Sequence, residues 1–107
     1  DWPSSPKLSV EEQKREFIFL LEKCKEANLN AVIVQIRPSG DAFYQSNYEP
    51  WSEWLTGKQG QPPSPFFDPL EFMLAETHKR NMEFHAWINP LRAVYHHKFS
   101  DIHPSHI

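Results

Sequence analysis

The strongest constraint on the fold of this chain is a pattern that occurs twice: an amphipathic helical segment followed directly by a short, strand-like segment. The first helix is expected from Ser9 to about Ala27, and its strand from Asn30 to Arg37. The second helix is expected from Asp68 to about Arg80, and its strand begins at Asn81 and stops before Pro90. Strands that alternate with helices imply a parallel sheet with right-handed crossovers. The sequence therefore predicts an α/β fold with the order helix, strand, long loop, helix, strand.

Local signals mark the ends of both helices. Ser9 and Glu12 have the spacing of a capping box, and Asp68 is suited to cap the second helix. Asn28 suits a left-handed residue at the end of the first helix, and Asn81 is expected to cap the end of the second. The apolar stripes that repeat at helical spacing and should face the core are Phe17, Leu20, Leu21 and Cys24 in the first helix and Leu70, Met73, Leu74 and Thr77 in the second.

The size and charge of the chain limit what it can be. Its 107 residues allow one domain, but two parallel strands make a poor core because each strand needs neighbours at both edges. We therefore expect residues 1–107 to be a piece of a larger domain, with open strand edges that promote self-association. The net charge of −3 excludes the basic footprint of a nucleic-acid-binding protein. No apolar run could span a bilayer, no signal-peptide pattern occurs, and the single Cys24 cannot form an internal disulfide.

The two predicted strands each carry polar residues on one alternating face. A strand buried between helices should be apolar on both faces, so a polar and aromatic face is costly unless it lines a site. The ends of barrel strands that carry catalytic and binding groups have this pattern. The alternatives are a core histidine whose hydrogen bonds are satisfied and a tryptophan that only fills the interior. The residues predicted to form this binding floor are Gln35, Arg37, His85, Trp87 and Asn89.

The segment between the first strand and the second helix, residues 38–67, is predicted to be a long non-regular loop. Ordered loops of this length are usually functional. Tyr44 and Trp51 lie there among carboxylates and amides, a composition that suits sugar binding. The alternative is that the aromatic residues only pack the loop down. Asp41 follows the strand end and is a candidate supporting catalytic group, or else a turn residue or a partner of Arg37, and Glu49 is expected to anchor the loop.

The order of several residue blocks resembles that of glycosyl-hydrolase-like family 10, a bacterial family with a (β/α)8 barrel. One difference is that this chain has Leu91 where the family's NPYR block has an aromatic residue. The blocks that carry the resemblance are Arg37-Pro38 with Gly40-Asp41-Ala42 and Tyr44, Glu49-Pro50-Trp51-Ser52 with Leu55-Thr56-Gly57, Asp68-Pro69-Leu70, His78, and His85-Ala86-Trp87 with Asn89-Pro90 and Arg92.

The resemblance implies that residues 1–107 are an N-terminal fragment of a glycosidase-like barrel domain, whose second and third strands are the two predicted here. It implies a bacterial glycoside hydrolase that cleaves a polysaccharide, with cell-wall glycan favoured, outside the cytoplasm. The main acid and nucleophile would lie on later strands, so the fragment alone should be inactive. Arg92 would join the residues that bind substrate. The alternative is a non-catalytic carbohydrate-binding or interaction module on the same scaffold.

The sequence predicts neither a metal site nor a cofactor. Histidines are frequent near the end of the chain, but they lack the spacing of a tetrahedral metal site and have no cysteine partners. Only three glycines occur, and none belongs to a phosphate-binding loop. The histidines in question are His96, His97, His103 and His106.

Overall fold

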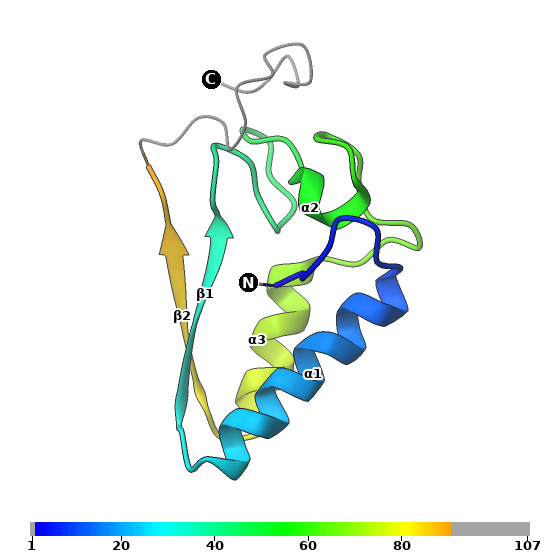
Figure 1. Cartoon of the computed structure of the whole chain (residues 1–107). Helices are drawn as coiled ribbons and strands as arrows, with labels where there is room; N and C mark the ends of the chain where they lie inside the picture. Colours follow the sequence, from blue (N-terminus) through cyan, green and yellow to red (C-terminus); the bar gives the residue numbers. More distant parts are fainter. Residues whose placement is uncertain (1, 91–107) are drawn as a thin grey trace.

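The computed structural model describes residues 2–90 and confirms the predicted order of helices and parallel strands (Figure 1). Residues 38–67 were predicted to have no regular structure, and this was wrong at one point, because a single helical turn forms there. Ser52 Oγ accepts the amide of Trp54 at the start of this turn. The elements are α1 (Val10–Glu26), β1 (Ala31–Arg37), the short α2 (Glu53–Thr56), α3 (Pro69–Lys79) and β2 (Glu83–Ile88).

The predicted helix ends are confirmed. In the capping box of α1, Ser9 Oγ accepts the Glu12 amide at 3.1 Å, and the Glu12 carboxylate accepts the Ser9 amide at 2.9 Å. Asp68 caps α3 by accepting an amide one turn into the helix. Asn28 and Asn81 follow the two helices with φ angles of 62° and 58°. Asparagine tolerates this left-handed conformation, so the chain can turn sharply from each helix into the next strand.

The two strands pair in parallel, and both long helices lie on the same side of the sheet (Figure 1). Val32, Val34 and Phe84 face the helices and pack against the core. Ile33 points the other way and is 71% exposed. Within residues 2–90 no element covers this second face of the sheet. The register is regular from Ala31, opposite Glu83, to Gln35, opposite Trp87, and then shifts before the end of β1.

The core lies between α1, α3 and the covered face of the sheet, and the segment before α1 contributes to it. The Trp2 ring meets the Phe17 and Phe43 rings edge-on, with centroid distances of 5.6 and 6.0 Å. Its indole N–H donates to the backbone oxygen of Gln13 at 2.9 Å. Truncation of a buried aromatic ring of this kind typically costs about 3–5 kcal/mol. The buried apolar cluster consists of Trp2, Phe17, Leu21, Ile36, Phe43, Leu55, Met73 and Met82.

One residue of the predicted apolar stripe of α1 does not enter the core. Leu20 is 43% exposed, whereas Leu21 beside it is 1% exposed. The stripe extends past the edge of β1, where the structure describes no neighbouring strand. Leu20 and Cys24 line a groove of about 320 Å³ at this edge, together with Ile33, which points away from the helices. Helical periodicity shows which side of a helix is apolar, but not how much of that side a neighbour covers.

The loop after β1 is tied closely to the rest of the molecule. Ala42 forms a parallel bridge with Trp51, and its amide donates to the oxygen of Pro50 at 2.9 Å. The buried Gln13 side chain of α1 donates to the oxygen of Leu55 at 2.7 Å. The loop therefore forms part of the fold and holds its residues in place above the carboxyl end of the sheet.

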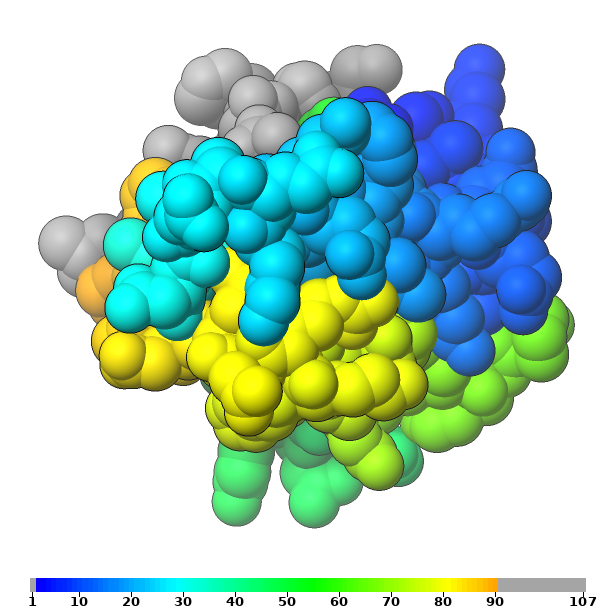
Figure 2. Space-filling view, turned by 90° about the horizontal axis from the view of Figure 1, so that it is seen from below, coloured from blue at the N-terminus to red at the C-terminus, as the bar shows by residue number. Residues whose placement is uncertain are grey.

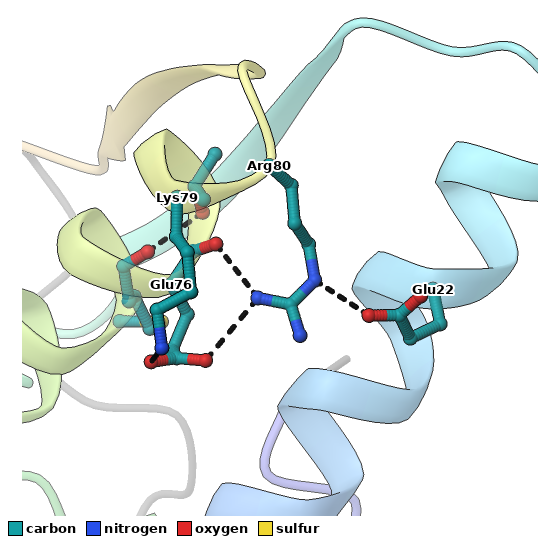
Figure 3. A network of polar contacts seen from close by, with 6 residues as sticks. Glu22, Glu76, Lys79 and Arg80 are labelled. Atoms are coloured by element: carbon teal, nitrogen blue, oxygen red, sulfur yellow. Dashed lines mark hydrogen bonds and ion pairs between the residues drawn. The ribbon is translucent and has the colours of Figure 1, made fainter.

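The opposite, amino end of the sheet is closed by ion pairs between the helices (Figure 3). Arg80 Nε lies 2.7 Å from a Glu22 oxygen of α1, and its Nη1 lies 3.2 Å from a Glu76 oxygen of α3. Lys25 of α1 donates to the oxygen of Arg80 at 2.7 Å. Figure 2 shows the surface at this end, where the segment around Arg80 meets the end of α1. These contacts join α1 to the turn that leads into β2.

Candidate functional site

The carboxyl ends of β1 and β2 bring together most of the residues that were predicted to bind substrate. Residues paired across parallel strands point to the same face, so Gln35 and its partner Trp87 share the uncovered face with His85. Arg37 and Asn89 lie where the two strands end, and the amide of Asn89 donates to the oxygen of Arg37 at 3.0 Å. The polar residues of the two strands therefore meet at one end of the sheet.

Arg37 is held by two different parts of the chain. Its Nε donates to Glu49 Oε1 at 3.1 Å, and its Nη1 donates to the backbone oxygen of Asn89 at 3.4 Å. The side chains of Arg37 and Glu49 are 13% and 21% exposed, so their ion pair is partly shielded from water. The partner of Arg37 is thus Glu49, a residue predicted from the sequence only to anchor the loop.

Ser46 completes the environment of Glu49. Its hydroxyl donates to Glu49 Oε2 at 2.7 Å and accepts the backbone amides of Tyr48 and Glu49. This hydrogen bond and the Arg37 guanidinium hold the pKa of Glu49 below its ordinary value of 4.5, although burial acts to raise it. Glu49 is therefore a carboxylate at neutral pH and is a poor general acid. The Ser-x-x-Glu spacing was a sequence signal for this arrangement, because in a capping box the same spacing lets the serine hydroxyl accept the amide of the glutamate, as Ser46 does for Glu49.

Tyr44 lies next to this ion pair. Burial raises the pKa of Tyr44 above its ordinary value of 10.0, and the negative charge of Glu49 adds to the effect, while Arg37 acts against it. The ring packs against the core cluster, so it is only partly available to a ligand. Tyr44 is therefore a neutral phenol at the edge of the candidate site.

Trp87 offers a flat apolar surface that is fixed in place. The residue is 50% exposed on the face that no described element covers. Its indole N–H donates to Asn89 Oδ1 at 3.0 Å, and Asn89 Nδ2 donates to the oxygen of Pro38 at 3.2 Å. Asn89 thus uses both ends of its amide group on the protein, and it holds the edge of the indole while the ring stays exposed. Such a ring can stack on the apolar face of a sugar.

His85 and Gln35 lie further from the strand ends. His85 is more than half exposed, and its Nε2 is 3.4 Å from Glu83 Oε1, an ion pair that exists only when the histidine is protonated. Gln35 lines the groove at the edge of β1, into which Trp87 also extends. Within residues 2–90, His85 is a surface histidine of the uncovered face.

Asp41 and Trp51 lie within the loop. Asp41 is 4% exposed, and Gln59 Nε2 donates to its Oδ2 at 3.2 Å. The Trp51 ring meets the Phe66 ring edge-on at 5.9 Å and packs against the core. These positions favour packing and loop stability for Trp51, while the catalytic role of Asp41 stays a prediction.

Several predictions fall outside the described residues or concern absences. Arg92, Leu91 and the histidines near the end of the chain lie beyond residue 90, so the structure places none of them. Among residues 2–90, no group of three or more histidine, cysteine, aspartate or glutamate side chains could hold a metal ion. Over the same residues, no helix combines the length and the apolar character needed to cross a membrane.

Comparison with known proteins adds evidence independent of the geometry. The family model described as "Glycosyl hydrolase-like 10" matches residues 1–107. A Bacillus subtilis (strain 168) protein named glycosyl hydrolase YngK is 57% identical over 109 residues, which cover 98% of this chain and 21% of that protein. An Escherichia coli (strain K12) protein named glycosyl hydrolase DigH is 40% identical over 99 residues, which cover 86% of this chain and 22% of that protein. The chain spans about a fifth of the length of these curated relatives.

Proposed function

Because the chain belongs to the glycosyl hydrolase-like 10 family, we propose that the full-length protein hydrolyses glycosidic bonds and that the carboxyl end of this sheet forms one wall of its substrate site. The observation that carries the proposal is the half-exposed Trp87 ring, held by Asn89 beside the Arg37–Glu49 ion pair. A fixed aromatic ring next to a guanidinium suits a ligand with apolar C–H faces and polar substituents, as sugars have.

The position of this wall in the protein follows from the parallel arrangement. Barrel enzymes carry their active sites at the carboxyl ends of the strands, where Arg37 and Asn89 lie. We propose that β1 and β2 are the second and third strands of a (β/α)8 barrel, and that later strands complete both the barrel and the site. The shared position of α1 and α3 on one side of the sheet supports this arrangement, because barrel helices surround the strands (Figure 1).

The proposed substrate is bacterial cell-wall glycan, and the proposed location is outside the cytoplasm, where that polymer lies. Both proposals rest on the family. Gln35, Arg37, His85, Trp87 and Asn89 would form the binding wall, with Tyr44 at its edge and Trp51 supporting the loop above it. Arg92 joins this group on the resemblance alone.

The carboxyl groups that cleave the bond are proposed to lie on later strands. Glycoside hydrolysis generally needs one carboxyl group as an acid and a second as a nucleophile or base. Glu49 is bonded to Arg37 and Ser46 and has a lowered pKa, so it does not suit the role of the acid. Asp41 is buried beside Gln59 and would support catalysis indirectly.

A second candidate function, carbohydrate binding without hydrolysis, is favoured by the bonds of Glu49 to Arg37 and Ser46, which make it unsuited to act as the acid. A barrel that binds carbohydrate without hydrolysing it would also need the Trp87 surface and the Arg37 contact, but no acid–base pair. The two candidates differ in the residues at the later strand ends. Two carboxyl groups there, about 5–5.5 Å apart for a retaining enzyme or 6.5–9.5 Å for an inverting one, are required only by hydrolysis.

The test is to incubate the full-length protein with purified cell-wall glycan and to measure newly formed reducing ends. We expect turnover, and we expect Trp87→Ala to lower the affinity for glycan about tenfold while the exposed Phe19→Ala control has no effect. Binding of glycan without release of reducing ends would favour the non-catalytic module. If the protein neither binds nor hydrolyses the glycan, both candidate functions are overturned.

A separate measurement concerns residues 1–107 by themselves. We expect no turnover from this fragment, since the proposed acid and nucleophile lie elsewhere, and we expect self-association, since an unpaired strand edge can template pairing. Hydrolysis of glycan by the purified fragment would contradict the placement of the catalytic pair. A monomer in sedimentation at high concentration would contradict the self-association.

A further inference from the structure

We infer that Glu49 is a positioning residue, which holds the Arg37 guanidinium in a fixed orientation at the carboxyl end of the sheet so that it can meet the substrate. The inference rests on the proposed function, and it gives Glu49 a role beyond the anchoring of the loop that the sequence predicts. Glu49 itself is not expected to touch the sugar, because both of its carboxylate oxygens are bonded within the protein.

The geometry fixes Arg37 from two sides. Glu49 Oε1 receives Nε at 3.1 Å, and the oxygen of Asn89 receives Nη1 at 3.4 Å. A planar group with two anchored nitrogens can no longer rotate about its terminal bonds. Within residues 2–90 the guanidinium makes no hydrogen bond besides these two, so the second N–H of Nη1 and both N–H groups of Nη2 remain as donors for a hydroxyl or carboxylate of a ligand.

Glu49 is itself held rigidly. Ser46 Oγ donates to Glu49 Oε2 and accepts the Glu49 amide, so one hydroxyl binds both the side chain and the backbone of this residue. The next residue, Pro50, accepts the amide of Ala42 within the bridge that closes the loop. Movement of Glu49 would therefore require these loop contacts to break. Because Glu49 also bonds to Arg37, the loop restricts the movement of the guanidinium.

The same ion pair also affects the charge at the site. Glu49 balances the positive charge of Arg37 in surroundings that are mostly shielded from water. A guanidinium that is already paired holds a ligand mainly through the direction of its N–H groups and less through net charge. The ion pair therefore suits recognition of a ligand by the direction of its hydrogen bonds. For such recognition the orientation of the Arg37 guanidinium matters.

A purely structural role for Glu49 is the alternative, and the other end of the sheet supplies a matched control. Glu76 pairs with Arg80 at 3.2 Å, and its side chain is 15% exposed, close to the 21% of Glu49. The Arg80 cluster lies at the amino end of the sheet, away from the proposed site. Loss of either pair should lower stability by a similar amount, but only loss of the Glu49 pair should change binding.

The experiment compares Glu49→Ala, Glu49→Gln and Glu76→Ala in the full-length protein. Turnover of cell-wall glycan supplies kcat and KM, and calorimetry with glycan oligosaccharides supplies Kd independently of hydrolysis. We expect Glu49→Ala to raise KM and Kd by about 10- to 100-fold, since a small displacement of a substrate-positioning group can have effects of this size. Glu49→Gln should stay within about threefold of the wild type, because the amide oxygen can still accept Nε of Arg37. Glu76→Ala should leave KM and Kd unchanged.

The outcomes separate this inference from the proposed function. Equal KM and Kd values for Glu49→Ala and Glu76→Ala would overturn the positioning role while leaving hydrolysis in place. Binding without turnover would remove the hydrolase proposal, and the Kd values would still test Glu49. A crystal structure of Glu49→Ala gives a readout that needs no activity: we expect Arg37 to leave the oxygen of Asn89, and an unchanged Arg37 would overturn the inference.

Discussion

Each end of the two-stranded sheet carries an arginine paired with glutamate, and the two pairs have different surroundings. At the amino end, Arg80 joins α3 to α1 through Glu76 and Glu22, and its contacts lie among helices. At the carboxyl end, Arg37 joins a strand to a loop through Glu49, beside the exposed Trp87 ring. The same kind of ion pair thus joins two helices at the amino end and fixes an arginine beside an exposed aromatic ring at the carboxyl end. In barrel proteins the amino-terminal face serves stability and the carboxyl-terminal face serves function, and this is the division that we propose for the two ends of this sheet.

The largest expected effect tests whether the carboxyl-end loop is as well packed as the core near the amino end. Phe43→Ala should lower the free energy of unfolding by about 3–5 kcal/mol, because the ring is buried and meets Trp2 edge-on. Met82→Ala, at the amino end, should cost about 2–5 kcal/mol. Urea denaturation of the full-length protein, followed by circular dichroism, measures both. A change below about 1 kcal/mol for Phe43→Ala would mean that the loop packs less tightly than the structure indicates.

The next effect separates the two arginines by function. Arg37→Met should lower kcat/KM for cell-wall glycan about 100-fold, since the proposed contact with substrate is lost together with its alignment. Arg80→Met should leave kcat/KM within about twofold of the wild type once the fraction of folded protein is taken into account. Equal losses in the two variants would show that Arg37 and Arg80 do not differ in their contribution to activity.

A smaller effect is expected on stability at the amino end. Arg80→Met should lower the free energy of unfolding by about 1–2 kcal/mol at most, because Glu22 is more than half exposed and solvent screens its charge. The loss should shrink as salt is added. Thermal unfolding at low and high ionic strength measures this, and a loss that does not depend on salt would indicate that Arg80 contributes mainly through packing of its stem.

The smallest effect concerns acid pH. Folding lowers the pKa of Glu49 below 4.5 through Ser46 first and then Arg37. Its contribution to stability is therefore complete above the unfolded pKa of about 4.5 and is lost as the pH falls through the lower folded value. Glu49→Gln should reduce the fall in Tm on acidification.

Glu76→Gln should do the same at the other end. There, burial acts to raise the pKa of Glu76, but hydrogen bonds from Arg80 and Lys79 lower it overall. A fall in Tm between pH 5 and pH 3 that is unchanged in both variants would contradict the pairing at both ends.

Much of the fold could be predicted because the determining contacts are local. The capping box depends on Ser9 and Glu12, three positions apart, and the left-handed turns depend on single asparagines. The alternation of helix and strand was then enough to predict a parallel pair. The one-turn helix α2 was missed because four residues carry too little periodicity to be distinguished from a loop.

The candidate site could be predicted only in part. Strand alternation placed Gln35 and Trp87 on one face, as the register confirms. The partner of Arg37 could not be identified, because Glu49 is 12 positions away across a loop whose path the sequence does not specify. The contacts of Asn89 could not be predicted either: it was expected only as part of the binding floor, and its side-chain amide bonds to Trp87 and to the backbone oxygen of Pro38.

The sequence by itself determined the helices, their ends, the parallel order of the strands and the polar character of one strand face, because each depends on residues a few positions apart. Only the tertiary structure decided that Leu20 stays at an open edge, that the long loop packs into the core, and that Glu49 meets Arg37. These features depend on which distant segments come into contact, and such contacts form only when the whole chain buries its apolar surface together. The pairing of Arg37 with Glu49 at the carboxyl end of the sheet therefore depends on the fold, although both charged residues can be read from the sequence.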